Sequence, residues 1–198
     1  RPNTGVSATH TRIGDKALNV YGGSYIIPKE ILPVFHSLYY DSIFKYKKME
    51  YLTEKQLDTN CQILVDFDFR YNYDVDNRQH NKEHIQDMVL LYLEELKKFF
   101  KFEENKPFEI FIMEKDDVNR LEDKSLTKDG IHMIIGIQMD NTLQLMLRER
   151  ILKKLSDIWE LPLTNGWEDV LDEGISKGCV NWQLYGSQKP GHDAYKLS

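Results

Sequence analysis

The sequence predicts an α+β domain, an antiparallel sheet with two long helices on one face and an open second face. Between residues 62 and 186, short strand-like apolar runs alternate with two long helical patterns. Their order is strand, helix, strand, strand, helix, strand, which places both helices on one side of a sheet. The first run, 62–69, alternates apolar residues with Asp66 and Asp68, which makes the other side of the sheet polar.

The segments before this core are short. Residues 1–25 are polar and rich in glycine, which indicates an arm or short strands. A helical pattern over 28–46 is interrupted by Pro33. It ends in a basic cluster, the lysines at positions 45, 47 and 48. Such a cluster is typical of a solvated helix end, and contact with nucleic acid is the alternative.

The core elements follow in a regular order. We expect strands over 62–69, 108–113, 130–137 and 179–186, and helices over 80–101 and 141–159, with an acidic solvated connection over 114–123. Asn141 is expected to cap the second helix. This order is the split βαβ, ferredoxin-like arrangement, in which the first and third strands are central neighbours and the fourth flanks the first. We therefore expect an N-terminal α/β extension over 1–61 that packs on a core over 62–198.

Size, charge and cysteine content limit the classes of function. The 198 residues fit one domain with a small extra layer, and the net charge of −6 argues against a tight binder of duplex DNA. Two cysteines without metal-ligand spacing indicate a reducing, intracellular compartment and no zinc finger. No stretch approaches the roughly 18 apolar residues of a membrane helix, so we expect no membrane partner. A start at Arg1 and an abrupt end indicate a piece of a longer protein.

Asp66 and Asp68 carry the strongest chemical signal. A buried strand has no structural reason to hold two acids, because an unpaired buried carboxylate is expensive. Strand alternation places both acids and Arg70 on one face, and Phe67 and Phe69 on the other. A divalent metal would remove the repulsion between the two carboxylates. The pattern therefore predicts the metal-binding strand of a nucleotidyl-transfer site.

The strand over 130–137 supplies a neighbour for this pair. Its apolar residues at 131, 133 and 135 fit the helix-covered face, so Gly130 and His132 face the same way as the aspartates. We expect His132 to lie across an antiparallel pair from the acids, about 5 Å away at the backbone. A satisfied core histidine is the alternative, and the neighbouring acid pair favours a functional one.

A third acid and a set of phosphate ligands complete the prediction. Asp172 is the candidate acid near the last strand, with a solvated acidic loop as an almost equal alternative. After that strand, a glycine-rich turn offers Ser187, Lys189 and His192. These groups suit a triphosphate, although they also make an ordinary turn.

Together these residues predict two-metal phosphoryl transfer. Two Mg²⁺ or Mn²⁺ ions would be held by Asp66, Asp68 and Asp172, one to activate a 3′-hydroxyl and one to hold the triphosphate. The phosphate oxygens would be neutralised by His132, Arg70, Ser187 and Lys189.

The motifs resemble a known family. An Asp-x-Asp strand, a Gly-x-His strand about 60 residues further on and a later apolar-Asp resemble the three motifs of archaeo-eukaryotic primases. The ending Leu-Tyr-Gly-Ser-Gln-Lys-Pro-Gly-His-Asp-Ala-Tyr-Lys-Leu and the segments 9–12 and 22–28 are similar to the primase half of primase-helicases of nucleocytoplasmic large DNA viruses, the giant-virus and poxvirus-like group. Two departures concern phosphate contacts: Gly130 stands where many relatives have Ser, and Gln183 roughly where many have Arg.

The resemblance implies an RRM-like primase palm that makes primers on single-stranded DNA from NTPs or dNTPs in viral-type replication. It implies metal ligation by Asp66, Asp68 and Asp172 and nucleotide contacts by His132, with Gly130, and by Ser187 and Lys189. It also implies a superfamily 3 helicase C-terminal in the same polypeptide, hence a possible oligomer. A viral protein of this kind would act in the host cytoplasm, virus factory or nucleus.

Two other functions remain open from the sequence. A nucleotide-sugar glycosyltransferase also uses Asp-x-Asp, but it predicts a nucleotide-binding fold before the motif and gives no role to His132. A catalytically silent, RRM-like nucleic-acid-binding module would display aromatic residues on the open face, where this sequence places acids.

Overall fold

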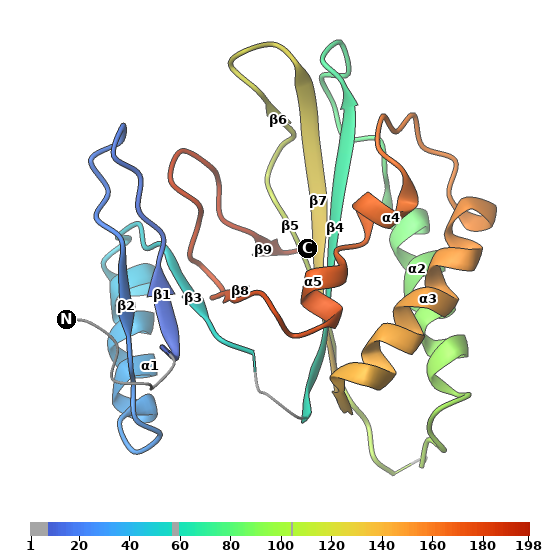
Figure 1. Cartoon of the computed structure of the whole chain (residues 1–198), viewed down its shortest axis with the longest axis horizontal. Coiled ribbons are helices and arrows are strands. Elements are labelled where there is room, and N and C mark those ends of the chain that lie inside the picture. Colours follow the sequence, from blue (N-terminus) through green and yellow to red (C-terminus); the bar gives the residue numbers. More distant parts are fainter. Residues whose placement is uncertain (1–7, 57–59, 104) are drawn as a thin grey trace. The chain divides into compact units, whose positions relative to one another are not determined.

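The protein is described by a computed structural model over residues 8–56, 60–103 and 105–198 (Figure 1). The chain divides into two compact units: a first unit of residues 1–56 and 180–196, and a second unit of residues 57–179 and 197–198. The expected division lay between residues 61 and 62. The structure differs mainly at the other end, because 180–196 joins the N-terminal residues rather than the core.

The second unit holds an antiparallel sheet with the order β4-β7-β5-β9. Its strands are β4 (Asn60–Asn72), β5 (Ile110–Glu114), β7 (Leu126–Asp140) and β9 (Lys196–Leu197), and the short β6 (Asn119–Arg120) also pairs with β7. The predicted first and third strands are thus direct neighbours. Their pairing sets Asp66 opposite His132 and Asp68 opposite Gly130, as the alternation of the sequence predicts.

Two helices cover one face of this sheet and lie side by side (Figure 1). Helix α2 (Lys82–Leu96) is capped by Asn81, whose side chain accepts from the backbone N–H of His84. Helix α3 (Asn141–Ile158) is capped by Asp140, which accepts from Leu143 N at 3.0 Å, so the predicted cap at Asn141 is wrong by one residue. Both Asp and Asn are good N-cap residues, so the sequence alone did not distinguish position 140 from position 141.

The core lies between the helices and alternate residues of the strands. From β4 it takes Val65, Phe67, Phe69 and Tyr71, all nearly or fully buried. The helices are also tied to each other by charge. Glu95 on α2 has a fully buried carboxylate and receives Arg150 Nε at 2.5 Å and Lys154 Nζ at 2.8 Å, both from α3. Burial raises the pKa of Glu95, but hydrogen bonds from Lys154, Lys98 and Arg150 outweigh it and lower the pKa to about 2.

The predicted fourth strand does not flank the first, and this is the main correction to the expected fold. Of 179–186, only β8 (Trp182–Gln183) is a strand, and it pairs with β3 (Leu52–Glu54) of the first unit. The edge of β4 is closed by the segment 164–172 instead. Asn165 donates to Asp68 O at 2.9 Å and accepts from Arg70 N at 3.1 Å, and Leu171 forms a single antiparallel bridge with Phe67.

Asn165 satisfies this edge because its amide carries a donor and an acceptor, as a strand backbone does. Two one-turn helices follow, α4 (Trp167–Val170) and α5 (Glu173–Ser176). The sheet therefore keeps the expected order of its first three strands, with a looped segment in the fourth place.

The first unit has its own sheet, of order β2-β1-β3-β8, from β1 (His10–Arg12), β2 (Gly23–Tyr25), β3 (Leu52–Glu54) and β8. Its helix α1 (Leu32–Tyr40) continues into a π-helical turn, η1 (Asp41–Lys45). Pro33 does not interrupt this helix but lies in its first turn, where a missing N–H costs nothing. The expected helix over 28–46 is therefore shorter and starts at residue 32.

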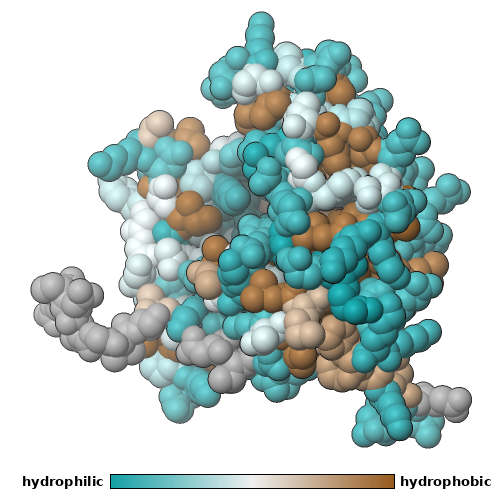
Figure 2. Space-filling model, turned by 45° about the vertical axis from the view of Figure 1, so that its right-hand side comes forward, coloured by the Kyte–Doolittle hydropathy of each residue, from teal (hydrophilic) through white to brown (hydrophobic). Residues whose placement is uncertain are grey.

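The surface of the helix-bearing side of the second unit is largely hydrophilic, with scattered hydrophobic residues (Figure 2). In the described part of the chain, no helix has the length and apolar character needed to cross a membrane.

Candidate metal and nucleotide site

Asp66 and His132 form the centre of the candidate site. They face each other on neighbouring strands, and His132 Nε2 lies 3.5 Å from Asp66 Oδ1. Asp66 is held in place by the core on the reverse side of its strand, where Val65 and Phe67 are buried. The expected pairing of the histidine with the first acid is therefore present in the structure.

Asp172 lies on the other side of Asp66. Because Leu171 pairs with Phe67 in an antiparallel bridge, the next pair along sets Asp172 opposite Asp66. The Asp172 N–H donates to Asp66 O at 3.1 Å. Leu171 is buried with the core, so Asp172 points to the same side of the sheet as Asp66. The sequence predicted this neighbour, although it expected the strand 179–186 rather than the segment 164–172 to flank β4.

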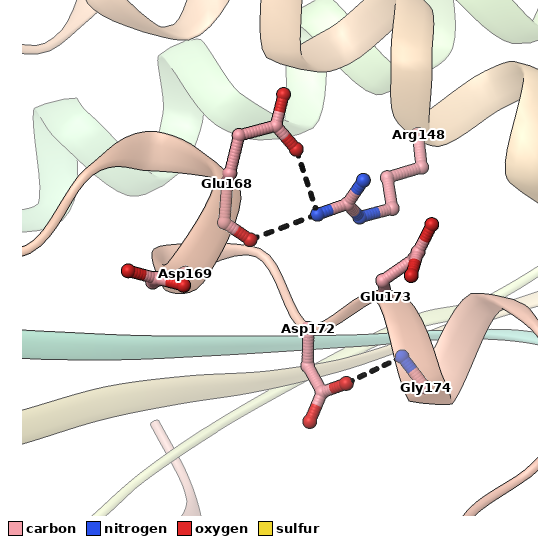
Figure 3. A pocket seen from close by; sticks show the side chains of 6 residues that line it. All are labelled: Arg148, Glu168, Asp169, Asp172, Glu173 and Gly174. Atoms are coloured by element: carbon pink, nitrogen blue, oxygen red, sulfur yellow. Dashed lines mark hydrogen bonds and ion pairs between the residues drawn. The ribbon is translucent and has the colours of Figure 1, made fainter.

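Arg148 of α3 holds the segment that carries Asp172 (Figure 3). Its guanidinium is buried and donates to Leu171 O at 2.9 and 2.7 Å and to Glu168 O at 2.9 Å. Leu171 is buried, so these donors supply hydrogen bonds to a carbonyl in the core. Arg148 also lines a pocket of about 380 Å³ with Gly174 and four acids, Glu168, Asp169, Asp172 and Glu173.

Asp68 and Arg70 form an ion pair on the same open face. Arg70 donates from Nη2 and Nε to Asp68 Oδ2 at 2.9 and 3.2 Å, and both side chains are 37% exposed. Gly130, opposite Asp68, donates its N–H to Asp129 Oδ1 at 2.9 Å.

The three predicted acids fit a divalent cation by donor type and by face. Carboxylates are the ligands that Mg²⁺ and Mn²⁺ take, and Asp66, Asp68 and Asp172 all lie on the open side of the sheet. All three contact protein groups: Asp66 contacts His132, Asp68 pairs with Arg70, and Asp172 accepts from Gly174 N at 2.6 Å (Figure 3). Accordingly, within residues 8–56, 60–103 and 105–198, no three Asp, Glu, His or Cys side chains are gathered as a ready metal site.

The tail residues belong to the first unit. Ser187 is 1% exposed, accepts from Leu52 N at 2.9 Å and shares a hydrogen bond of 2.9 Å with the Tyr39 hydroxyl. Its hydroxyl thus ties the tail to β3 and α1. Lys189 is exposed, and His192 N–H donates to Lys189 O at 3.0 Å. The nucleotide contacts of these three residues stay predictions.

Sequence reasoning missed a buried charged network beneath the site. Asp129 receives Arg78 Nε at 2.9 Å, and Glu114 contacts Arg78 Nη1 at 3.1 Å and His80 Nε2 at 2.6 Å. Burial lowers the pKa of Arg78, but the hydrogen bond and charge of Asp129 outweigh it and raise that pKa. The available signal was Asp129 itself, an acid on the apolar face of its strand, opposite Phe69. Glu114, expected in a solvated loop, is thus a partner in this network.

Comparisons with known proteins identify the family of this chain. A family described as "C962R protein N-terminal AEP domain" matches residues 14–198. The chain is also 31% identical over 172 residues to "Putative helicase L207/L206" of Acanthamoeba polyphaga mimivirus, which covers 84% of this chain and 17% of that protein. The chain thus spans less than a fifth of that relative's length. These matches confirm the resemblance drawn from the motifs: the chain belongs to the archaeo-eukaryotic primase (AEP) family, as a primase-type domain of the giant-virus kind.

Proposed function

We propose that this chain is the catalytic domain of a DNA primase or primase-polymerase, which joins nucleotides on a single-stranded DNA template with two divalent cations. One observation carries the proposal: Asp66 stands on an open sheet face between His132 on one neighbouring strand and Asp172 on the other side. That arrangement brings two carboxylate ligands for a cation together with a histidine that can contact a phosphate group.

The cation ligands in this proposal are Asp66, Asp68 and Asp172. Mg²⁺ or Mn²⁺ bound there supplies activation of a 3′-hydroxyl and charge neutralisation at the triphosphate. The buried neighbours of these acids in the sequence fix the direction in which the carboxylates point, because Phe67 and Leu171 are locked in the core. The acids therefore present their oxygens on the open side before any ligand arrives.

The nucleotide ligands are His132 and Arg70, with Gly130 leaving room beside them. His132 Nε2 lies 3.5 Å from Asp66 Oδ1, so its ring is held over the same part of the sheet. Arg70 uses two of its five N–H donors on Asp68. We infer that the remaining donors face the phosphates.

The arrangement favours this function over the two alternatives. A glycosyltransferase site leaves His132 without a role. A silent RRM-like module needs aromatic rings on the open face, whereas Phe67 and Phe69 are fully buried on the helix side. The relative described as a helicase is far longer than this chain, so we further infer a longer primase-helicase and an oligomer imposed by the helicase.

The test is a priming assay on single-stranded DNA with labelled NTPs or dNTPs and each metal in turn. The double substitution Asp66→Ala with Asp68→Ala should abolish metal-dependent incorporation. The matched control is Asp74→Ala with Asp76→Ala, two exposed acids of the same spacing just beyond β4. If both variants are folded by circular dichroism and make equal amounts of primer, the assignment of Asp66 and Asp68 as metal ligands is wrong.

A further inference from the structure

The two units carry opposite charge. By sequence, the first unit has ten Lys and Arg against six Asp and Glu, a net charge of +4. The second unit has 16 basic against 26 acidic residues, a net charge of −10. The net charge of −6 is therefore the sum of one basic unit and one acidic unit. Nucleic acid is attracted by a local positive surface rather than by a total charge.

Positive charge in the first unit gathers around the π-helical turn η1. Residues 42–49 hold three exposed lysines, at 45, 47 and 48, and no acid. Residues 180–192 also lack acids, and part of this segment packs beside η1, where Phe44 stacks on Tyr185 at 5.8 Å. Lys45 is paired at 3.8 Å with Asp41, but that pair is exposed and weak.

Aromatic rings stand among these lysines. Tyr40 is 60% exposed, Tyr46 is 59% exposed and Tyr185 is 41% exposed. Lys45 Nζ and Lys48 Nζ lie 5.3 and 6.0 Å from the centre of the Tyr46 ring. Rings so open to solvent add little to a core. Tyr40 and Tyr185 both contact Phe44, with ring centres 5.2 and 5.8 Å from it.

The backbone holds this surface in an uncommon form. A π-turn is rare and often occurs at functional sites. Lys47 has a φ of +54°, a region that a lysine seldom adopts. The tail is fixed beneath by the Tyr39 hydroxyl, which donates to Tyr185 O at 2.9 Å. The lysines and rings are thus presented by a defined turn rather than by a loose helix end.

We propose that this η1 surface, formed by Tyr40, residues 44–48 and Tyr185, binds single-stranded nucleic acid. The bases stack on the tyrosine rings and the lysines contact the phosphates, which is the combination that single strands require. This proposal rests on the proposed function, because the η1 surface would hold the single-stranded template of the primase. Nucleic-acid contact by the lysines, the alternative to a solvated helix end, is the interpretation that the structure favours.

Fluorescence anisotropy of a labelled 20-nucleotide oligo-dT tests the proposal, with the full chain in EDTA so that no metal is needed. Tyr46→Ala should weaken binding at least about fivefold, the lower end for removing one base–ring stack, and Tyr46→Phe should stay within about twofold of wild type. Tyr21→Ala is the matched control, because Tyr21 is 77% exposed in the same unit and should have no effect.

The lysines are tested by the salt dependence of the same binding. Replacing the lysines at 45, 47 and 48 by alanine should reduce the slope of log K against log [salt] by about 0.7 for each phosphate that is no longer neutralised. The control triple replaces Lys97, Lys101 and Lys153, exposed lysines of the acidic unit. Slopes and affinities that change no more than in this control overturn the proposal, as does binding of a duplex that is as tight as that of oligo-dT and insensitive to Tyr46→Ala.

The proposed catalytic function can fail separately. Asp66→Asn with Asp68→Asn should keep oligo-dT affinity in EDTA, because neither residue lies on the η1 surface. If wild type binds through that surface but makes no primers, the nucleotidyl-transfer proposal fails and the binding surface stands. If primers are made while the η1 variants bind as tightly as wild type, the surface proposal fails alone.

Discussion

The two faces of strand β4 are built from neighbouring residues and have opposite properties. On the helix side, Val65, Phe67 and Phe69 are at most 3% exposed and belong to one core. On the open side, Asp66 and Asp68 are partly exposed and bond to groups that a ligand could replace. Along β4, residues that stabilise the core therefore alternate with residues of the candidate site. The core face fixes the geometry in which the open face holds its charges.

The largest expected effect comes from removing a core side chain. Phe67→Ala empties the space between β4, Trp159 and Leu171 and should destabilise the protein by about 3–5 kcal/mol in urea titration. Phe111→Ala, a partly exposed ring on β5, is the control and should cost much less. A destabilisation by Phe67→Ala below about 1 kcal/mol would contradict the division between the two faces.

Asp66→Asn should affect activity and leave stability almost unchanged. The shape of the side chain is kept and a charge on the open face is removed, so the unfolding free energy should change by less than about 1 kcal/mol. Primer synthesis should fall at least about 100-fold, because the site loses charge stabilisation at the reacting phosphate. Activity close to that of wild type in a folded variant contradicts the role of this residue.

Arg148→Met tests the link between the faces, since this side chain holds the segment that carries Asp172. The change leaves the carbonyl groups of Leu171 and Glu168 without their donor and should cost about 2–3 kcal/mol. It should also lower kcat more than it raises KM for nucleotide, because Asp172 loses its position. Lys153→Met, an exposed site on the same helix, is the control and should change neither quantity.

The smallest expected effect is a pH dependence on the helix side. The pKa of Glu95 is lowered to about 2 in the folded protein, from an ordinary value of 4.5, so its charge stabilises the fold above pH 4.5. That contribution should fade as pH falls from 4.5 towards 2, and it should reach only about 1–2 kcal/mol because the three paired cations are 42–47% exposed and screened by solvent. Glu95→Gln should therefore be less stable than wild type at neutral pH, and the difference should shrink on acidification. A constant difference across this range would show that Glu95 does not titrate as described.

The sequence predicted most of the second unit because its signals are local. Strand alternation placed Asp66, Asp68 and His132 on one face, and the register of β4 with β7 agrees with this. Both long helices were found from their apolar spacing, with errors of a few residues at their ends, where capping residues compete.

The parts that the sequence did not predict depend on long-range partners. Residues 182–183 carry strand-like side chains, but nothing local says that they pair with β3 rather than β4. Asn165 closes the edge of β4 through a side-chain amide, which has no periodic signal. The turn sequence around Ser187 gave no signal that its hydroxyl would be buried against Leu52 and Tyr39. The Arg78 network was missed because its members are far apart in the chain.

The most direct measurement of the central claim is cation binding without catalysis. Isothermal titration with Mn²⁺ should show binding to wild type that is weakened at least about tenfold by Asp66→Asn with Asp172→Asn, since those residues are opposite each other at the proposed cation site. Asp74→Asn with Asp76→Asn should bind as wild type does. Equal Mn²⁺ affinity in wild type and in the Asp66, Asp172 variant would contradict the account.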